Sequence, residues 1–245
     1  MTVPQHKICL VTGAAGVVGE AISRRFAALG CRVILVDIQA ERIGALAAEL
    51  GGMALPMDIS DEAAVADGLA GLAADWRGID ILVNNAGILT NNKAAATSAG
   101  EWRKVLAVNL DGAFYLSKAC LPAMRAQGWG RIINICSLAM KTGGLTAGTA
   151  YTTSKSALGG LTFSLARETA CDGITVNGIA PAYVLTPMVT EQLTQAQRDQ
   201  LLAQIPVGRF CEASEVAHVA AFLASPESGF ITGEIIDING GLHLD

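Results

Sequence analysis

Tyr151 and Lys155 are the two residues whose types and spacing most directly indicate chemistry. They lie four apart at the start of a predicted helix, and this spacing places two side chains on one helix face. A phenol has a pKa of about 10, and a nearby ammonium group favours the phenolate and lowers that pKa. Tyr151 is therefore a candidate general acid/base. An isolated pair of this kind is more often merely an exposed helix pair, so the surrounding elements must decide.

A glycine-rich turn lies near the N-terminus, between a predicted strand and a predicted helix. The strand-like run Lys7–Val11 is followed by Thr12-Gly13-Ala14-Ala15-Gly16-Val17-Val18-Gly19, and apolar residues then recur at helical spacing. Glycines let the backbone approach a pyrophosphate, and the N–H groups at the helix start attract its charge. Glycines also occur at turns for steric reasons, and the spacing here differs from the G-x-G-x-x-G fingerprint.

Asp37 ends the next predicted strand, Arg32–Asp37, eighteen residues after Gly19. A carboxylate at that place can accept hydrogen bonds from the adenosine ribose hydroxyls, although a strand-end Asp also serves as a turn or helix cap. The succession of strand, glycine turn, helix, strand and Asp favours a dinucleotide site. The next residue is Ile38, not Arg or Lys, so a 2′-phosphate would meet a like charge, and NAD is favoured over NADP.

The rest of the chain continues the alternation of strands and helices. This pattern predicts an α/β fold with a doubly wound parallel sheet of the Rossmann type, in three αβα layers, as a single domain over 1–245. Ligands bind such sheets at the carboxyl ends of the strands. Predicted helices cover about 40–50, 61–76, 101–127, 151–170, 189–204 and 213–224, predicted strands end near residues 58, 83, 136, 177 and 238, and residues 138–150 form a loop.

The polar helix near the C-terminal part of the chain follows two prolines, which makes about residues 183–208 a candidate substrate lid. A surface helix with no gating role fits the same pattern.

Composition excludes several functional classes. The net charge of −5 and a pI near 5.2 give no basic footprint for nucleic acid or an anionic membrane. No apolar run approaches the roughly 20 residues that span a bilayer. The six cysteines are scattered without a metal-binding spacing. A cytoplasmic protein with no metal site and a small-molecule substrate is the expectation.

Taken together, the motifs closely resemble the short-chain dehydrogenase/reductase family over nearly the whole chain. The resemblance rests on Thr12-Gly13 with Gly19, Asp58, Asn84-Asn85-Ala86-Gly87, Asn109, Ser137, Tyr151-x-x-x-Lys155, Pro181 with Thr186, Ile231-Thr232-Gly233 and Asn239-Gly240-Gly241.

The resemblance implies a role for each matching residue. Tyr151 acts as general acid/base, Ser137 hydrogen-bonds the substrate oxygen, Lys155 lowers the Tyr151 pKa and holds the nicotinamide ribose, and Asn109 positions a relay water. It also implies a homotetramer. The implied NAD contacts are Gly13, Gly16, Val18, Gly19, Asp37, Asp58, Ile59, Asn85, Gly87, Tyr151, Lys155, Pro181, Val184 and Thr186.

Three features depart from the family pattern. The middle glycine is Gly16 rather than the residue at position 17, the usual Pro-Gly pair is Pro181-Ala182, and Ser137 precedes Tyr151 by fourteen residues where thirteen is usual. None of these changes removes a reacting group.

The leading functional hypothesis is an NAD-dependent oxidoreductase acting on a small secondary alcohol, a polyol or the corresponding ketone. The alternatives are a 3-oxoacyl thioester (acyl-carrier-protein) reductase and a non-catalytic dinucleotide-binding regulator. Substrate choice is expected to depend on residues 89–97, 138–149 and 183–204. Lys141 is a candidate contact for an anionic substrate, or simply a solvated loop lysine.

Overall fold

The centre of the molecule is a seven-stranded, fully parallel sheet with the order β3-β2-β1-β4-β5-β6-β7. The computed structural model describes residue 3 and residues 6–186 and 194–244. The direction of winding reverses between β1 and β4, the switch point at which such sheets bind ligands. The strands are β1 (Ile8–Thr12), β2 (Arg32–Asp37), β3 (Met53–Pro56), β4 (Ile81–Asn84), β5 (Gly130–Ile135), β6 (Ile174–Pro181) and β7 (Ile235–Ile238).

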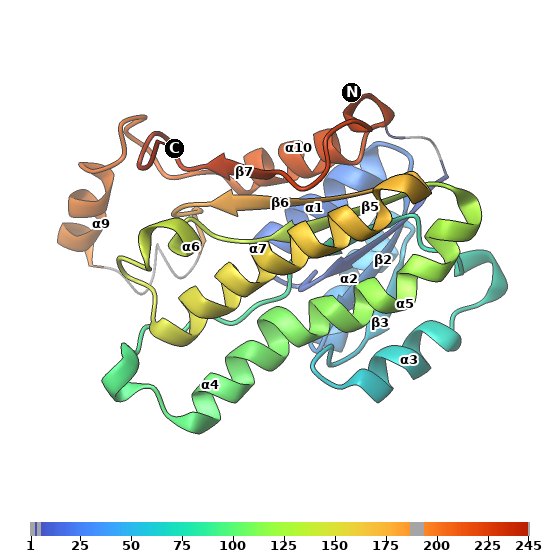
Figure 1. Cartoon of the computed structure of the whole chain (residues 1–245), viewed down its shortest axis with the longest axis horizontal. Helices are drawn as coiled ribbons and strands as arrows, with labels where there is room; N and C mark the ends of the chain where they lie inside the picture. The colour runs from blue at the N-terminus through green and yellow to red at the C-terminus, as the bar shows by residue number, and fades with distance from the viewer. Residues whose placement is uncertain (1–2, 4–5, 187–193, 245) are drawn as a thin grey trace.

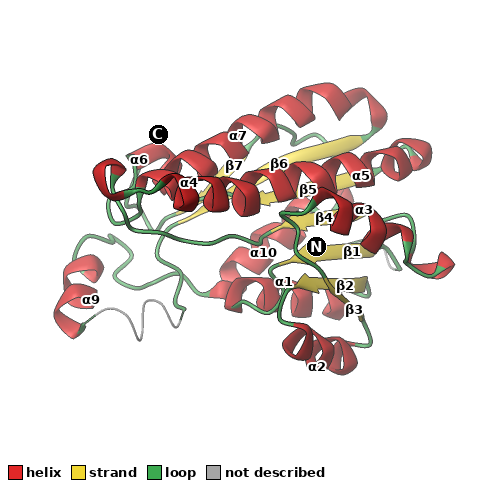
Figure 2. Ribbon diagram, turned by 90° about the horizontal axis from the view of Figure 1, so that it is seen from below, coloured by secondary structure: helices red, strands yellow, loops and turns green. Residues whose placement is uncertain are grey.

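Helices cover both faces of this sheet, which confirms the predicted three-layer architecture (Figures 1 and 2). One face packs against α1 (Val17–Ala28), α2 (Ala40–Leu50) and α10 (Ala213–Leu223). The other packs against α3 (Glu62–Ala70), α5 (Gly112–Gln127) and α7 (Thr149–Thr169). The shorter helices are α4 (Ala99–Leu106), α6 (Ala139–Thr142) and α9 (Gln195–Leu202), with single turns at Ala74–Trp76, Ala94–Ala96, Ala170–Asp172 and Pro226–Ser228.

Alternate residues of each central strand pack into opposite cores. In β1, Cys9 and Val11 join the core under α1 and α10, whereas Ile8 and Leu10 join the core under α5 and α7. Because successive side chains of a strand point to opposite faces, a strand buried on both faces is apolar throughout. The continuous apolar runs of the sequence have this cause.

The predicted helix over 101–127 is wrong in one respect, because it is not continuous. Helix α4 ends at Leu106, a π-helix (η3) covers Ala107–Asp111, and α5 begins at Gly112. The side chain of Asn109 in η3 forms hydrogen bonds with Ile88 and Ser154, which are distant in sequence. Tertiary contacts therefore account for the wider π-helical turn.

Three other predicted boundaries also require correction. The helix predicted over 61–76 ends at Ala70 and is followed by the separate turn Ala74–Trp76. The strand predicted to reach residue 58 ends at Pro56, which pairs with Asp37 at the end of β2. The predicted loop 138–150 contains the short helix α6.

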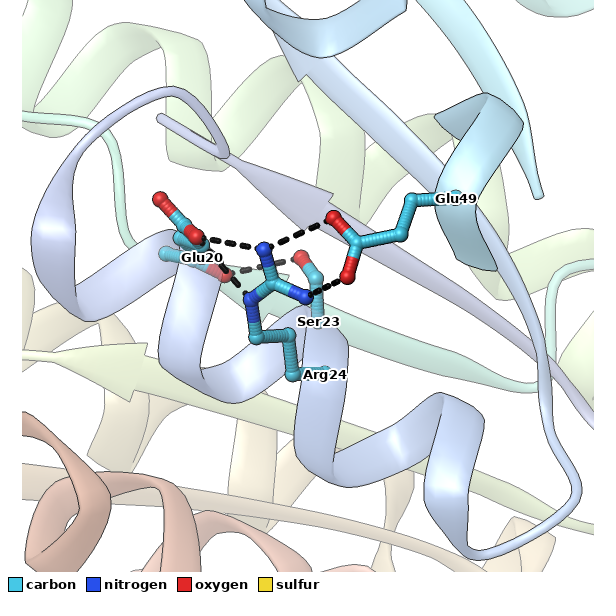
Figure 3. A network of polar contacts seen from close by, with 5 residues as sticks. Glu20, Ser23, Arg24 and Glu49 are labelled. Atoms are coloured by element: carbon cyan, nitrogen blue, oxygen red, sulfur yellow. Dashed lines mark hydrogen bonds and ion pairs between the residues drawn. The ribbon is translucent and has the colours of Figure 1, made fainter. Parts of the chain in front are cut away.

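A surface network joins the two helices that follow β1 and β2. Arg24 of α1 lies between Glu20 and Glu49, and Glu49 comes from α2 (Figure 3). Arg24 Nη2 donates to Glu49 Oε2 at 2.9 Å, and Arg24 Nε donates to Glu20 Oε1 at 2.9 Å. The same helix begins at the glycine turn, so this link helps to fix its direction, with a strength that salt screens.

The candidate lid is partly described. Its helical part is α9, which begins at Gln195 and is stabilised at its start by a capping box between Thr194 and Gln197. Residues 187–193, also included in the predicted lid, lie outside the described residues. Across the described part of the chain, none of the helices has the length and apolar character needed to cross a membrane.

Candidate active site

The glycine turn after β1 needs two of its glycines for steric reasons. Gly13 has a φ of +63°, and a Cβ there would lie 2.8 Å from Ala86 Cα. A Cβ on Gly19 would overlap the Gly13 carbonyl oxygen and lie 2.8 Å from Asn85 Nδ2. Gly16 is different, because a Cβ there would approach the Gly13 oxygen at 3.3 Å and would have no other neighbour within 4 Å among the described residues. It occupies the N-cap of α1, which has no side-chain cap.

Asn85 holds the turn in place from the neighbouring strand end. Its Nδ2 donates to the carbonyl oxygens of Thr12 and Gly13 at 2.9 and 3.2 Å. Its backbone N–H, like that of Ala86, donates to Thr12 Oγ1 at 2.9 Å. The predicted cofactor contact of Asn85 therefore coexists with a structural role that joins β1 to β4.

Asp37 lies beside the same turn at the end of β2. Its Oδ2 accepts from Ala15 N at 3.1 Å, and its Oδ1 accepts from Gln39 N at 3.0 Å. Each carboxylate oxygen keeps acceptor capacity after one such bond. Asp37 thus braces the turn and remains able to accept hydroxyl hydrogen bonds, while the neighbouring Ile38 is 72% exposed.

Asp58 and Ile59 follow β3 on the same edge of the sheet. Asp58 Oδ1 accepts from Ser60 N at 2.9 Å and from Ser60 Oγ at 2.7 Å, and these bonds lower the pKa of Asp58. Ile59 is buried against Gly112, where a Cβ would lie 2.7 Å from Ile59 Cδ1. Their side chains are therefore occupied by local contacts.

A cavity of about 590 Å³ opens at the carboxyl ends of the strands. It brings together residues from the segment after β4, from β5, from α7 and from the end of β6 and the segment that follows it, which are distant in sequence. The predicted site residues that line it are Val18, Asn85, Gly87, Ser137, Tyr151, Lys155, Pro181, Val184 and Thr186. The other predicted residues, Gly13, Gly16, Gly19, Asp37, Asp58, Ile59 and Asn109, lie outside its lining.

Ser137, Tyr151 and Lys155 form the polar centre of this cavity. Burial raises the pKa of Tyr151 above its ordinary value, and a hydrogen bond with Ser137 offsets part of that shift. Lys155 is only 3% exposed, and its Nζ donates to the Ile135 carbonyl oxygen at 2.6 Å. Burial lowers the pKa of Lys155 to about 8. At neutral pH the pair is therefore a phenol beside an ammonium group.

One expectation about this pair is corrected. The sequence predicts that Lys155 lowers the Tyr151 pKa, yet the Lys155 Nζ lies 5.9 Å from the Tyr151 ring centroid and bonds to a carbonyl oxygen instead. The hydrogen bond that favours the phenolate comes from Ser137, and burial outweighs it.

Asn109 stands behind this centre in the π-helix. Its Oδ1 accepts from Ile88 N at 2.8 Å, and its Nδ2 donates to Ile88 O at 3.1 Å and to Ser154 Oγ at 3.0 Å. A Cβ on Gly87 would lie 3.3 Å from Asn109 Oδ1 and 3.4 Å from Lys155 Nζ, so the three residues meet closely. Asn109 is placed to orient the Lys155 environment, and its relay role stays a prediction.

The remaining lining residues are ones that the motifs did not single out. They include Leu89, Asn91, Thr142, Tyr183, Gln197 and Leu201, all within the three segments expected to set substrate choice. No spacing rule could identify them, because they come from loops and from α9.

Lys141 forms an ion pair with Asp237 of β7, and its Nζ lies 2.7 Å from Asp237 Oδ2. An anionic substrate, which the sequence suggests as a partner of Lys141, would therefore compete with Asp237 for this ammonium group.

The fold and the site define a class of protein, the dinucleotide-binding α/β oxidoreductases. A family model described as Enoyl-(Acyl carrier protein) reductase matches residues 13–243. The chain belongs to the short-chain dehydrogenase/reductase family, as the motifs predicted.

Curated relatives include two bacterial proteins named 3-oxoacyl-[acyl-carrier-protein] reductase FabG. The one from Haemophilus influenzae is 40% identical over 98% of this chain and 99% of its own length. The one from Escherichia coli is 41% identical over 98% of each chain.

Solved structures agree on the fold. A structure described as a candidate NAD(P)-dependent gluconate 5-dehydrogenase from Beutenbergia cavernae, with NADP bound at low occupancy, is 36% identical and superposes with a TM-score of 0.91 over 98% of each chain. A glucose/ribitol dehydrogenase-type member from Brucella melitensis is 33% identical, with a TM-score of 0.88 over 100% of each chain.

Proposed function

We propose that this chain is a nicotinamide-dinucleotide-dependent reductase that converts a 3-oxoacyl thioester into the 3-hydroxyacyl thioester. Two kinds of observation support the proposal over the small-alcohol or polyol hypothesis that the sequence favours. The curated relatives named above carry the name of such a reductase, and apolar side chains in the cavity lining suit an acyl group better than a hydroxyl-rich polyol.

The cavity lining is the observation that carries this proposal. Lys155 is the one charged residue among its described lining residues, and residues 187–193 contain no Lys or Arg in the sequence. Leu89, Leu138 and Leu145 supply apolar surface. A sugar acid carries a carboxylate that calls for a cation such as Arg, whereas an acyl thioester is neutral near its reacting carbonyl.

The residues present fit a nicotinamide dinucleotide. The uncapped start of α1 and the glycine turn suit a pyrophosphate, Asp37 suits the adenosine ribose, and Lys155 suits the nicotinamide ribose. Pro181, Val184 and Thr186 line the cavity, and in this proposal they contact the nicotinamide. When bound, the reduced cofactor supplies the hydride.

Tyr151 and Ser137 perform the proton step in this proposal. Ser137 Oγ donates a hydrogen bond to the substrate carbonyl oxygen and so holds it beside the Tyr151 hydroxyl. Tyr151 then transfers its phenolic proton to that oxygen as the carbonyl becomes an alcohol. The raised Tyr151 pKa keeps the proton in place at neutral pH, which suits an acid that acts in reduction. The phenolate that remains is reprotonated from solvent.

For the cofactor, we infer a preference for NADH over NADPH. Asp37 places a carboxylate beside the turn, and the adjacent Ile38 offers no positive charge to a 2′-phosphate. The Asp37 carboxylate is also the observation that favours the second candidate function, an NAD-linked dehydrogenase of a small alcohol or polyol. The third hypothesis, a non-catalytic regulator, gains no support from a cavity that gathers Ser137, Tyr151 and Lys155.

A cofactor and substrate matrix tests the proposed function. Purified protein is assayed by nicotinamide absorbance with NADH and NADPH against an acetoacetyl thioester, and with NAD and NADP against polyols and gluconate. We expect the thioester with NADH to give the highest kcat/KM. Turnover of a polyol without measurable thioester reduction would replace the proposal with the second candidate.

A further inference from the structure

Two loops that are far apart in sequence form one wall of the cavity. Leu89 and Asn91 line it from the segment after β4, and residues 144–147 line it from the segment between α6 and α7. Neither loop belongs to the glycine turn or to the Ser137, Tyr151 and Lys155 centre. This wall is therefore on the substrate side of the cavity.

Lys93 joins these two loops through its ammonium group. Its Nζ donates to the carbonyl oxygens of Gly144 and Ala147, both at 2.7 Å. Among the residues that the structure describes, these two carbonyl oxygens accept hydrogen bonds from no other group. A charged donor makes shorter and stronger hydrogen bonds than a neutral one. The position of residues 144–147 thus depends largely on Lys93.

Backbone contacts continue the junction up to the start of α7. Gly148 N donates to Thr90 O at 2.7 Å, and Thr149 N donates to Asn92 O at 3.0 Å. A Cβ on Gly148 would lie 2.6 Å from Asn92 O and 2.7 Å from Thr90 O, so the loops touch at a glycine. A larger residue at position 148 would force the two loops apart.

Both ends of this wall are tied to the predicted catalytic residues. Ile88, one residue before Leu89, is held by Asn109 through both its N–H and its carbonyl oxygen. Thr149 is the first residue of α7 and precedes Tyr151 by two positions. The wall is fixed at these ends, and Lys93 fixes its middle.

We propose that Lys93 is a positioning residue that sets substrate affinity by holding the 144–147 segment against the 88–93 segment. As a statement about thioester affinity, the proposal rests on the proposed function. Without the ammonium group the 144–147 carbonyls turn to water, the wall widens, and the acyl part of the substrate loses contacts. The cofactor end of the cavity is built by other residues and keeps its affinity.

The experiment compares Lys93→Met, Lys93→Arg and Lys118→Met. Met keeps the apolar stem of the lysine, Arg keeps a charged donor, and Lys118 is an exposed lysine on α5 paired with Glu62, remote from the wall. We expect Lys93→Met to raise the KM for an acetoacetyl thioester about tenfold, with kcat and the Kd for NADH within about twofold of the unmodified enzyme. Lys93→Arg should recover most of the lost affinity, and Lys118→Met should leave all three constants unchanged.

Amide hydrogen exchange gives a readout that needs no substrate. In Lys93→Met the amides of Gly148 and Thr149 should exchange at least tenfold faster, while the amides of β4 and β5 keep their protection. Unchanged exchange there, or a KM within twofold of the unmodified value, would overturn the positioning role. Equal losses of kcat, KM and NADH affinity would also overturn it, because they indicate general destabilisation. If the unmodified enzyme reduces no thioester, the proposed function fails and the exchange result alone decides the role of Lys93.

Discussion

Burial favours the uncharged form of both Tyr151 and Lys155, so it raises the pKa of Tyr151 and lowers the pKa of Lys155. Tyr151 keeps its proton more firmly, while Lys155 loses its proton more easily, with a pKa of about 8. A charged group in a low-dielectric site is costly unless it is paired. Lys155 has a carbonyl oxygen as its partner instead of a carboxylate. The charge of this lysine is therefore the part of the site most sensitive to pH.

The pH dependence of reduction follows from these shifts. Below about pH 8, Lys155 is an ammonium group and Tyr151 is a phenol, so kcat/KM should be flat from pH 6 to about 7.5. As the pH rises through about 8, Lys155 becomes neutral, its hydrogen bonds to the ribose weaken, and kcat/KM should fall toward tenfold per unit. Steady-state kinetics between pH 6 and 9.5 measure this. A profile that stays flat to pH 9.5 would mean that the Lys155 charge is not needed or is not lost.

We predict that cofactor preference depends on Asp37 and Ile38. A lost charged hydrogen bond together with a like-charge repulsion is worth roughly 2 to 4 kcal/mol, so NADH should be favoured about 30- to 1,000-fold in kcat/KM. The double change Asp37→Ala with Ile38→Arg should bring the ratio to unity or below.

Because Asp37 also accepts from Ala15 N and Gln39 N, Asp37→Asn serves as the matched control, since it keeps an acceptor oxygen but removes the charge. Equal kcat/KM for NADH and NADPH in the unmodified enzyme would contradict this prediction and would show that Asp37 only stabilises the glycine turn.

The motifs in the sequence were sufficient to predict that Ser137, Tyr151 and Lys155 lie in one cavity, because the carboxyl ends of parallel strands meet at one edge of the sheet. They were insufficient for Lys93, because a lysine in a loop has no periodicity and its partners are backbone carbonyls 51 and 54 residues away. They were also insufficient for the Tyr151 pKa, which depends on burial.

Among the elements, the turn from β1 to α1 carries the clearest steric requirement. Gly19→Ala should weaken NADH binding at least tenfold and lower the Tm, because its Cβ would overlap the Gly13 carbonyl oxygen and crowd Asn85. Gly16→Ala should change the Kd for NADH by less than about threefold, because the φ of −81° suits alanine and, among the described residues, one contact at 3.3 Å is the sole close approach. Fluorescence titration with NADH measures both. Similar losses in the two variants would show that Gly16 is needed against the pyrophosphate itself.

The helix that carries Asn109 illustrates what sequence could not indicate about elements. The apolar spacing over 101–127 is compatible with an unbroken helix, and the π-helix at Ala107–Asp111 arises from hydrogen bonds to Ile88 and Ser154. Contacts that are made only in the folded chain leave no local pattern. The strands, by contrast, were predictable because burial on both faces demands apolar runs.

For the whole molecule, exposed aromatic side chains on the outer helices indicate where subunits could pack against each other. Phe114 of α5 and Phe163 of α7 are 42% and 51% exposed, and Trp102 of α4 is 36% exposed. Apolar surface of this kind is expected at an interface. We predict a homotetramer, in which four chains of 25.3 kDa give a mass of about 100 kDa.

Light scattering at micromolar concentration tests this assembly. Phe114→Glu and Phe163→Glu should shift the mass toward smaller species, because a carboxylate would be buried in the interface. A 25 kDa species from the unmodified protein at this concentration would contradict the prediction.

The proposed reduction requires that the Tyr151 hydroxyl delivers the proton, and Tyr151→Phe tests this requirement most directly. The change removes one oxygen and leaves the ring. Reduction of an acetoacetyl thioester is followed by NADH absorbance, and NADH binding is followed by fluorescence in the same preparation. We predict a kcat lower by about 1,000-fold with the Kd for NADH within about threefold of the unmodified enzyme. A variant that keeps a tenth of the unmodified turnover would contradict the assignment of Tyr151 as the proton donor.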